Sequence, residues 1–81
     1  MIKGLIEGRI VHFVLPDGPR IGEHRPAIIT KVWNADPGTV NLQVFMDGLR
    51  DNGGTTRWFS SVLPDEENKR EGTWHFPERV E

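Results

Sequence analysis

The chain has 81 residues, no cysteine and a formal net charge of −2. A chain of this length forms one domain with a modest core, and without cysteine it has neither disulfides nor thiolate metal ligands. No apolar run approaches the ~20 residues that span a bilayer, and the acidic start is too short for a secretory signal. We therefore expect a soluble, cytoplasmic protein that does not contact a membrane.

The charge is unevenly distributed along the chain. Residues 1–33 carry five basic and three acidic side chains, whereas residues 34–81 carry five basic and nine acidic ones. This balance argues against a binder of duplex DNA, which displays a basic face able to displace counterions. A local site for one small anion remains open, because several cationic side chains lie within 23 residues of each other: Arg9, Arg20, His24, Arg25 and Lys31.

Turn signals separate about five strand-like runs. Residues 8–15 are rich in β-branched and aromatic side chains and end at Pro16-Asp17-Gly18-Pro19. The next runs are residues 26–34, which begin with Pro26, and residues 40–48, and the turn at Asp36-Pro37-Gly38 predicts that these two form a hairpin. Residues 56–63, after the Asp51–Gly54 loop, and residues 72–76 supply the last two strands.

The segment from Val40 to Gly48 has the clearest pattern in the chain. Apolar Val40, Leu42, Val44 and Met46 alternate with polar residues, and Phe45 is the exception on the polar face. This period of two predicts a half-buried strand with one face in the core and one face available for binding.

No segment has a convincing helical period. The charged segment 64–71 is predicted to be a solvated loop with at most one helical turn. Short strands joined by Gly and Pro turns favour closure into a barrel, because closure removes exposed edges. We predict an all-β chain, residues 1–81 as a single small SH3-like antiparallel β-barrel of about five strands. An incompletely closed edge strand would allow a homo-oligomer to form by strand addition.

The three tryptophans are candidates for the core and for binding. Trp33, Trp58 and Trp74 lie at or near strand ends, and a core this small has room for one or two such rings. Tryptophan beside arginine is also typical of binding surfaces, since the ring stacks on planar or cationic partners. Trp58, which follows Arg57, is the first choice for a ligand contact.

The three histidines do not predict a metal site. His12, His24 and His75 are separated by 12 and 51 residues, which matches no compact ligand motif, and Glu23 or Asp47 could complete a site only if the fold brought them close. Ser60 and Ser61 lack a nucleophile motif, and Gly53-Gly54 has no following Lys or helix. We predict no metal, no cofactor and no catalytic residues.

One segment resembles a known enzyme family. Gly22-Glu23-His24-Arg25-Pro26-Ala27-Ile28-Ile29-Thr30 looks like the entry to the second strand in MazF and PemK type toxin ribonucleases, which have SH3-like barrels. The resemblance covers about a quarter of the chain and implies the barrel, with Arg25 as a phosphate contact. Those enzymes are longer and contain helices, and none of their other catalytic motifs can be placed here.

A longer resemblance covers nearly the whole chain. The order of Gly8–Gly18, His24–Ile29, Val40–Gly48 and Gly72–Glu78 is similar to small uncharacterised proteins of tailed bacteriophages and prophages. This implies a phage product that acts in a bacterial host, without assigning a function.

Together these features predict a non-enzymatic binding protein. In the first hypothesis it sequesters a small, nucleotide-like anion, and in the second it docks on a host protein through its aromatic face; a MazF-like ribonuclease is the third. The predicted binding residues are His24, Arg25, Arg57, Trp58, Trp74 and His75.

Overall fold

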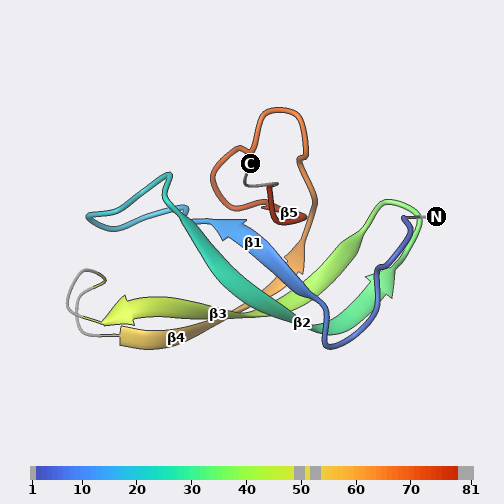
Figure 1. Cartoon of the computed structure of the whole chain (residues 1–81), viewed down its shortest axis with the longest axis horizontal. Helices are drawn as coiled ribbons and strands as arrows, with labels where there is room; N and C mark the ends of the chain where they lie inside the picture. Colours follow the sequence, from blue (N-terminus) through green and yellow to red (C-terminus); the bar gives the residue numbers. More distant parts are fainter. Residues whose placement is uncertain (1, 49–50, 52–53, 79–81) are drawn as a thin grey trace.

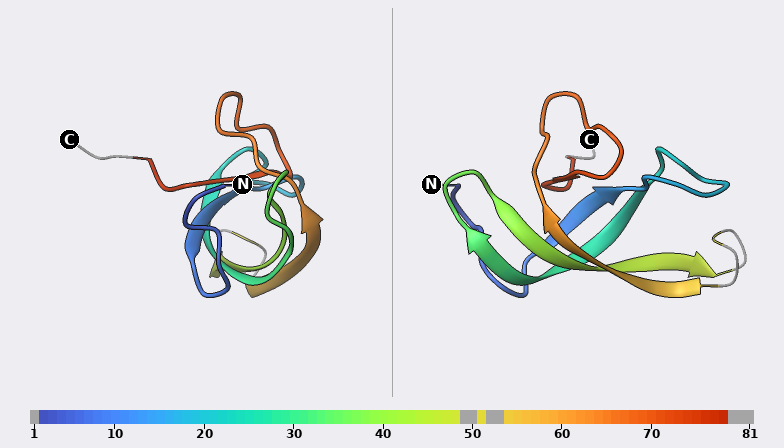
Figure 2. Two further views of the ribbon diagram at one scale, coloured as in Figure 1. Left: turned by 90° about the vertical axis from the view of Figure 1, so that its right-hand side faces the viewer. Right: turned by 180° about the vertical axis from the view of Figure 1, so that it is seen from behind.

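The computed structural model describes residues 2–48, 51 and 54–78. It is all-β, with five strands: β1 (Ile10–Val14), β2 (His24–Asn34), β3 (Thr39–Gly48), β4 (Gly54–Val62) and β5 (Trp74–His75). They form one antiparallel sheet in the order β4-β3-β2-β1-β5. The strands curl around a common axis, with β1 and β4 on opposite sides (Figures 1 and 2). The prediction of an all-β chain of five strands is confirmed.

The two ends of the sheet meet at one point. Pro64, just after β4, forms a parallel bridge with Trp74 of β5, where the Trp74 N–H donates to the Leu63 carbonyl at 3.1 Å and the Asp65 N–H donates to the Trp74 carbonyl at 2.9 Å. This bridge joins β5, at one end of the strand order, to the chain just after β4, at the other end. Closure of this sheet into an SH3-like barrel stays a prediction.

The core lies on the concave face of the sheet, where the alternating side chains converge. Val40, Leu42 and Val44 of β3 are fully buried, as their pattern predicts, while Met46 is only partly buried and Phe45 is 40% exposed. The other strands and loops contribute the rest of the core: Leu5, Val11, Phe13, Leu15, Ala27, Ile29, Val62 and Trp74.

Asn41 is a polar residue within this core. A register shift in the β3–β4 pairing falls between Val40 and Leu42, so Asn41 is buried although it alternates with apolar neighbours. Its Oδ1 accepts the Trp33 indole N–H at 2.8 Å and the Ser61 backbone N–H at 3.0 Å. A buried amide oxygen is tolerated here because two donors satisfy it.

The boundaries of two strands, β2 and β5, differ from the predicted ones. The fifth strand contains only Trp74 and His75, and the second begins at His24, two residues before Pro26. The recorded β2–β3 pairs begin at Ala27, so Pro26, which has no N–H, lies where β2 pairs with β1. Because β2 begins at His24, this histidine belongs to the sheet and not to the preceding loop.

The remaining predictions concern loops and the membrane. Residues 66–68 form turns within a loop, as expected, and Asp65 holds this loop through Arg70, whose Nε lies 2.6 Å from Asp65 Oδ2. Two residues of the predicted loop before β4, Asn52 and Gly53, lie outside the described residues. Within the described ranges, no helix has the length and hydrophobicity needed to cross a bilayer.

Candidate metal centre

All three histidines of the chain project from three neighbouring strands. His75 of β5 is the direct register partner of His12 of β1, and His24 of β2 is the partner of Val14, two residues along β1 from His12. Side chains two residues apart on a strand point to the same face, and directly opposed residues share a face. The three imidazoles therefore lie together on the face opposite the buried Val11 and Phe13.

Glu78 completes the group from the segment that follows β5. Its Oε1 lies 3.0 Å from His12 Nδ1, and its Oε2 lies 3.3 Å from His24 Nδ1 and 3.0 Å from His75 Nε2. One carboxylate thus touches all three rings. We call His12, His24, His75 and Glu78 the His/Glu cluster; each offers one ligand atom, and these four atoms lie within 4.8 Å of one another.

The rings meet edge to face, so their nitrogen-bearing edges are not hidden in a stack. The centroid distances are 4.7 Å for His24 and His75, 5.7 Å for His12 and His75, and 6.4 Å for His12 and His24, with interplanar angles of 63° to 81°. Rings tilted in this way can direct nitrogen lone pairs toward a common point.

His75 is the most constrained member of the cluster. It is fully buried, and within the described part of the chain neither ring nitrogen has a hydrogen-bond partner. Nε2 is close to Glu78 but does not meet hydrogen-bond geometry. A buried polar atom without a partner costs about 1–3 kcal/mol, so a ligand that satisfied one of these nitrogens would stabilise the fold.

The protonation states favour metal ligation. Burial lowers the pKa of His75, although the nearby Glu78 carboxylate opposes this shift, so the ring is neutral at neutral pH. Burial would raise the pKa of Glu78. This is outweighed by its own backbone N–H and by the neighbouring imidazoles of His75 and His12, which together lower the pKa to about 2. The cluster therefore offers a neutral imidazole and an ionised carboxylate, the forms that bind metals.

Of the six predicted binding residues, the structure brings only His24 and His75 together. Arg25 is buried, and its Nε and Nη2 donate to the two carboxylate oxygens of Asp51 at 3.0 and 3.1 Å. Its Nη2 also lies 2.9 Å from Glu23, and its Nη1 donates to the His24 carbonyl. The guanidinium has these protein partners on all its nitrogens, so we do not carry its predicted phosphate contact forward.

Trp74 likewise does not reach the surface. It is fully buried, and its indole N–H donates to the Gly38 carbonyl at 2.9 Å. A ligand therefore has no free face of this ring on which to stack. Trp58 is 59% exposed, as expected for a contact residue, but it lies on β4 and is not part of the cluster.

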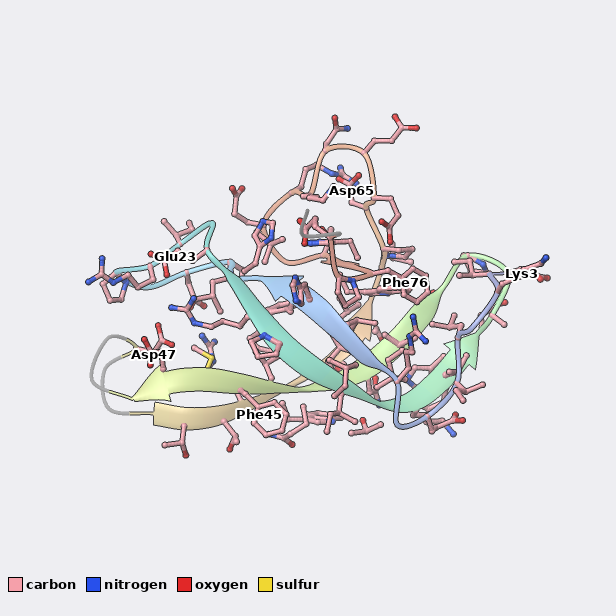
Figure 3. All side chains as sticks on the ribbon, viewed as in Figure 1. Lys3, Glu23, Phe45, Asp47, Asp65 and Phe76 are labelled. Carbon is pink, nitrogen blue, oxygen red and sulfur yellow. The ribbon has the colours of Figure 1, made fainter. Side chains whose placement is uncertain are left out.

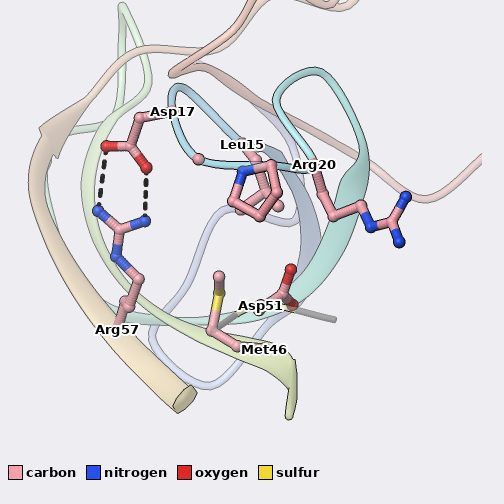
Figure 4. A pocket seen from close by; sticks show the side chains of 8 residues that line it. Leu15, Asp17, Arg20, Met46, Asp51 and Arg57 are labelled. Atoms are coloured by element: carbon pink, nitrogen blue, oxygen red, sulfur yellow. Dashed lines mark hydrogen bonds and ion pairs between the residues drawn. The ribbon is translucent and has the colours of Figure 1, made fainter. Parts of the chain in front are cut away.

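Arg57 lies at a separate hollow. It pairs with both carboxylate oxygens of Asp17, at 2.8 and 3.3 Å, across an opening of about 230 Å³ (Figure 4). Asp51 and Met46 also line this opening, whereas the Arg20 side chain points away from them. Three of the charged groups that line the hollow, Asp17, Asp51 and Arg57, are already paired, so the hollow is a weaker candidate than the cluster.

The sequence-based reasoning missed His12 and Glu78 as site residues. His12 and His75 lie within predicted strands and His24 lies two residues before another, and this was the available signal. Their convergence depends on the strand order β2-β1-β5, which separations in sequence do not reveal. Comparison of the chain with protein-family models, curated proteins and solved structures finds no match.

Proposed function

We propose that this protein binds one divalent first-row transition metal ion, best represented by Zn²⁺, through His12, His24, His75 and Glu78. The observation that carries the proposal is the convergence of four ligand atoms within 4.8 Å. Imidazole nitrogen with one carboxylate oxygen is a donor set that suits Zn²⁺ and its neighbours, whereas Mg²⁺ and Ca²⁺ prefer oxygen alone.

The spacing of the cluster supports this assignment. A tetrahedral ion with bonds of about 2.0–2.1 Å holds its ligand atoms about 3.3 Å apart. The contacts of Glu78 with the three rings, 3.0, 3.3 and 3.0 Å, are close to that separation. The more distant ligand atoms, which lie within 4.8 Å of one another, would have to approach by up to about 1.5 Å on binding.

We propose a binding role and not catalysis on the basis of the number of protein ligands. Four protein ligands fill a tetrahedral site, whereas catalytic zinc sites keep a position open. We keep the setting implied by the resemblance, a phage product in a bacterial cytoplasm, and assembly into a homo-oligomer, as parts of this proposal. Docking on a host protein is the second candidate, supported by the exposure of Trp58 and Phe45.

The experiment is a calorimetric titration of chelator-treated protein with Zn²⁺, with metal content checked by elemental analysis. We expect one ion per chain, and His12→Ala and Glu78→Ala each weaken binding by at least about tenfold, since even loss of an outer contact costs 10–100-fold. Glu67→Gln is the matched control, because Glu67 is an exposed carboxylate outside the cluster. Absence of binding, or equal affinity in all variants, would overturn the proposal.

A further inference from the structure

An open hollow of about 320 Å³ lies directly beside the His/Glu cluster. It is lined by His24 of the cluster and by Arg25, Pro26, Phe45, Met46 and Asp47. Pro26 is also the direct register partner of His12, so this lining residue neighbours a second histidine of the cluster. The hollow and the cluster are therefore adjacent parts of one surface.

The hollow has an apolar side and a charged end. Pro26 is exposed, and Phe45 is 40% exposed on the outer face of β3 (Figure 3). Phe45 was the one residue that interrupted the polar face in the sequence, and this position gives it a flat surface beside the cluster. Arg25 and Asp47 supply the charged groups of the lining.

Glu78 is the cluster member best placed to exchange. The three histidines are held in paired strands, whereas Glu78 follows Pro77 in the segment after β5. Its side chain is 42% exposed, against 0% for His75. Without Glu78, a divalent ion held by three imidazole nitrogens has no anionic ligand, so its charge attracts an anion to the fourth position.

We propose that the metal-loaded site binds a small organic anion with a flat apolar body, whose anionic group replaces Glu78 on the ion while its body lies on Pro26 and Phe45. This inference rests on the proposed metal-binding function. It refines the predicted anionic ligand by moving the anion from the arginines to the metal.

The test uses the full chain loaded with Co²⁺, whose visible spectrum reports changes in coordination. Benzoate is the probe, acetate has the anion without the ring, and benzamide has the ring without the charge. We expect benzoate to shift the spectrum and to bind at least about tenfold more tightly than acetate, and benzamide to cause no shift. Glu78→Ala at saturating Co²⁺ should tighten both anions, because the competing carboxylate is gone.

The Phe45→Ala variant tests the apolar contact with the ligand separately from metal binding. It should retain Co²⁺ and acetate binding but lose the preference for benzoate, whereas Ile6→Ala, which removes a 63% exposed side chain outside the hollow, should keep it. A protein that binds Co²⁺ but shows no shift with either anion overturns the inference and leaves metal binding intact. Equal affinity for benzoate and acetate, or a preference for benzoate that survives Phe45→Ala, would contradict the proposed contact between the ligand's apolar body and Phe45. If Co²⁺ does not bind, the proposed function itself fails.

Discussion

Glu78 accepts a hydrogen bond from His12 Nδ1 at 3.0 Å across a separation of 66 residues. The contact fastens the segment after β5 to the middle of β1, beside the one strand pair, β1–β5, that is only two residues long. A ligand that held both side chains would therefore connect the end of the described chain to the sheet. This relation makes stability a sensitive reporter of the His/Glu cluster.

Zn²⁺ should raise the melting temperature of the protein. At an ion concentration one hundred times the dissociation constant, the native state gains about 2.7 kcal/mol, which corresponds to about 10–20 °C for a domain of this size. Thermal scans with Zn²⁺, with Zn²⁺ plus chelator and with neither will measure this. The shift should disappear in His12→Ala. An equal shift in that variant would mean that the ion acts elsewhere.

The Arg25–Asp51 pair should make stability depend on acid pH. The hydrogen bonds from Arg25, and one from the Asp47 backbone N–H, lower the pKa of Asp51 below its ordinary value. Because the unfolded pKa is about 3.9, this contribution is complete above about pH 5 and is lost as the pH falls through the folded pKa.

Denaturant titrations between pH 7 and pH 2 will measure this dependence. Asp51→Asn should be less stable at neutral pH and should show a weaker loss of stability on acidification than the wild type. Glu67→Gln, which changes an exposed carboxylate in the loop after β4, is the comparison. Parallel pH profiles for wild type and Asp51→Asn would contradict the assignment.

Gly38→Ala should destabilise the fold by about 2 kcal/mol or more. Gly38 has a φ of +86°, and a Cβ there would come within 2.6 Å of Ile2 Cδ1 and 2.9 Å of Pro64 Cγ. Gly18 is a matched control, with a φ of +85° but no atom within 4 Å of its added Cβ. Urea denaturation of both variants isolates the packing contribution, and equal losses would show that the backbone conformation alone matters.

Asn41→Ala should cost about 1–3 kcal/mol, because the Trp33 indole N–H and the Ser61 N–H lose their acceptor together. Asn68→Ala, an exposed asparagine in the loop after β4, should change stability by less than about 0.5 kcal/mol. Chemical denaturation followed by tryptophan fluorescence measures both. A neutral Asn41→Ala would mean that solvent replaces the lost acceptor.

Local sequence pattern was sufficient for the strands. The alternation of Val40, Leu42 and Val44 predicts their burial because side chains of a strand point alternately to two faces. The same argument fails at Asn41, where the register shift between neighbouring strands turns a polar residue inward. It also fails at Arg25. The sequence predicts an exposed cation there, but the side chain is buried and pairs with Asp51.

The sequence by itself therefore determined the class of fold and the approximate strands, because these follow from short-range periodicity and turn chemistry. Only the tertiary structure decided the candidate site. His12, His24, His75 and Glu78 are brought together by the order β2-β1-β5 and by the register of three strands, which are set by contacts between distant parts of the chain. A shift of one residue in either pairing would turn a histidine to the opposite face and dissolve the cluster.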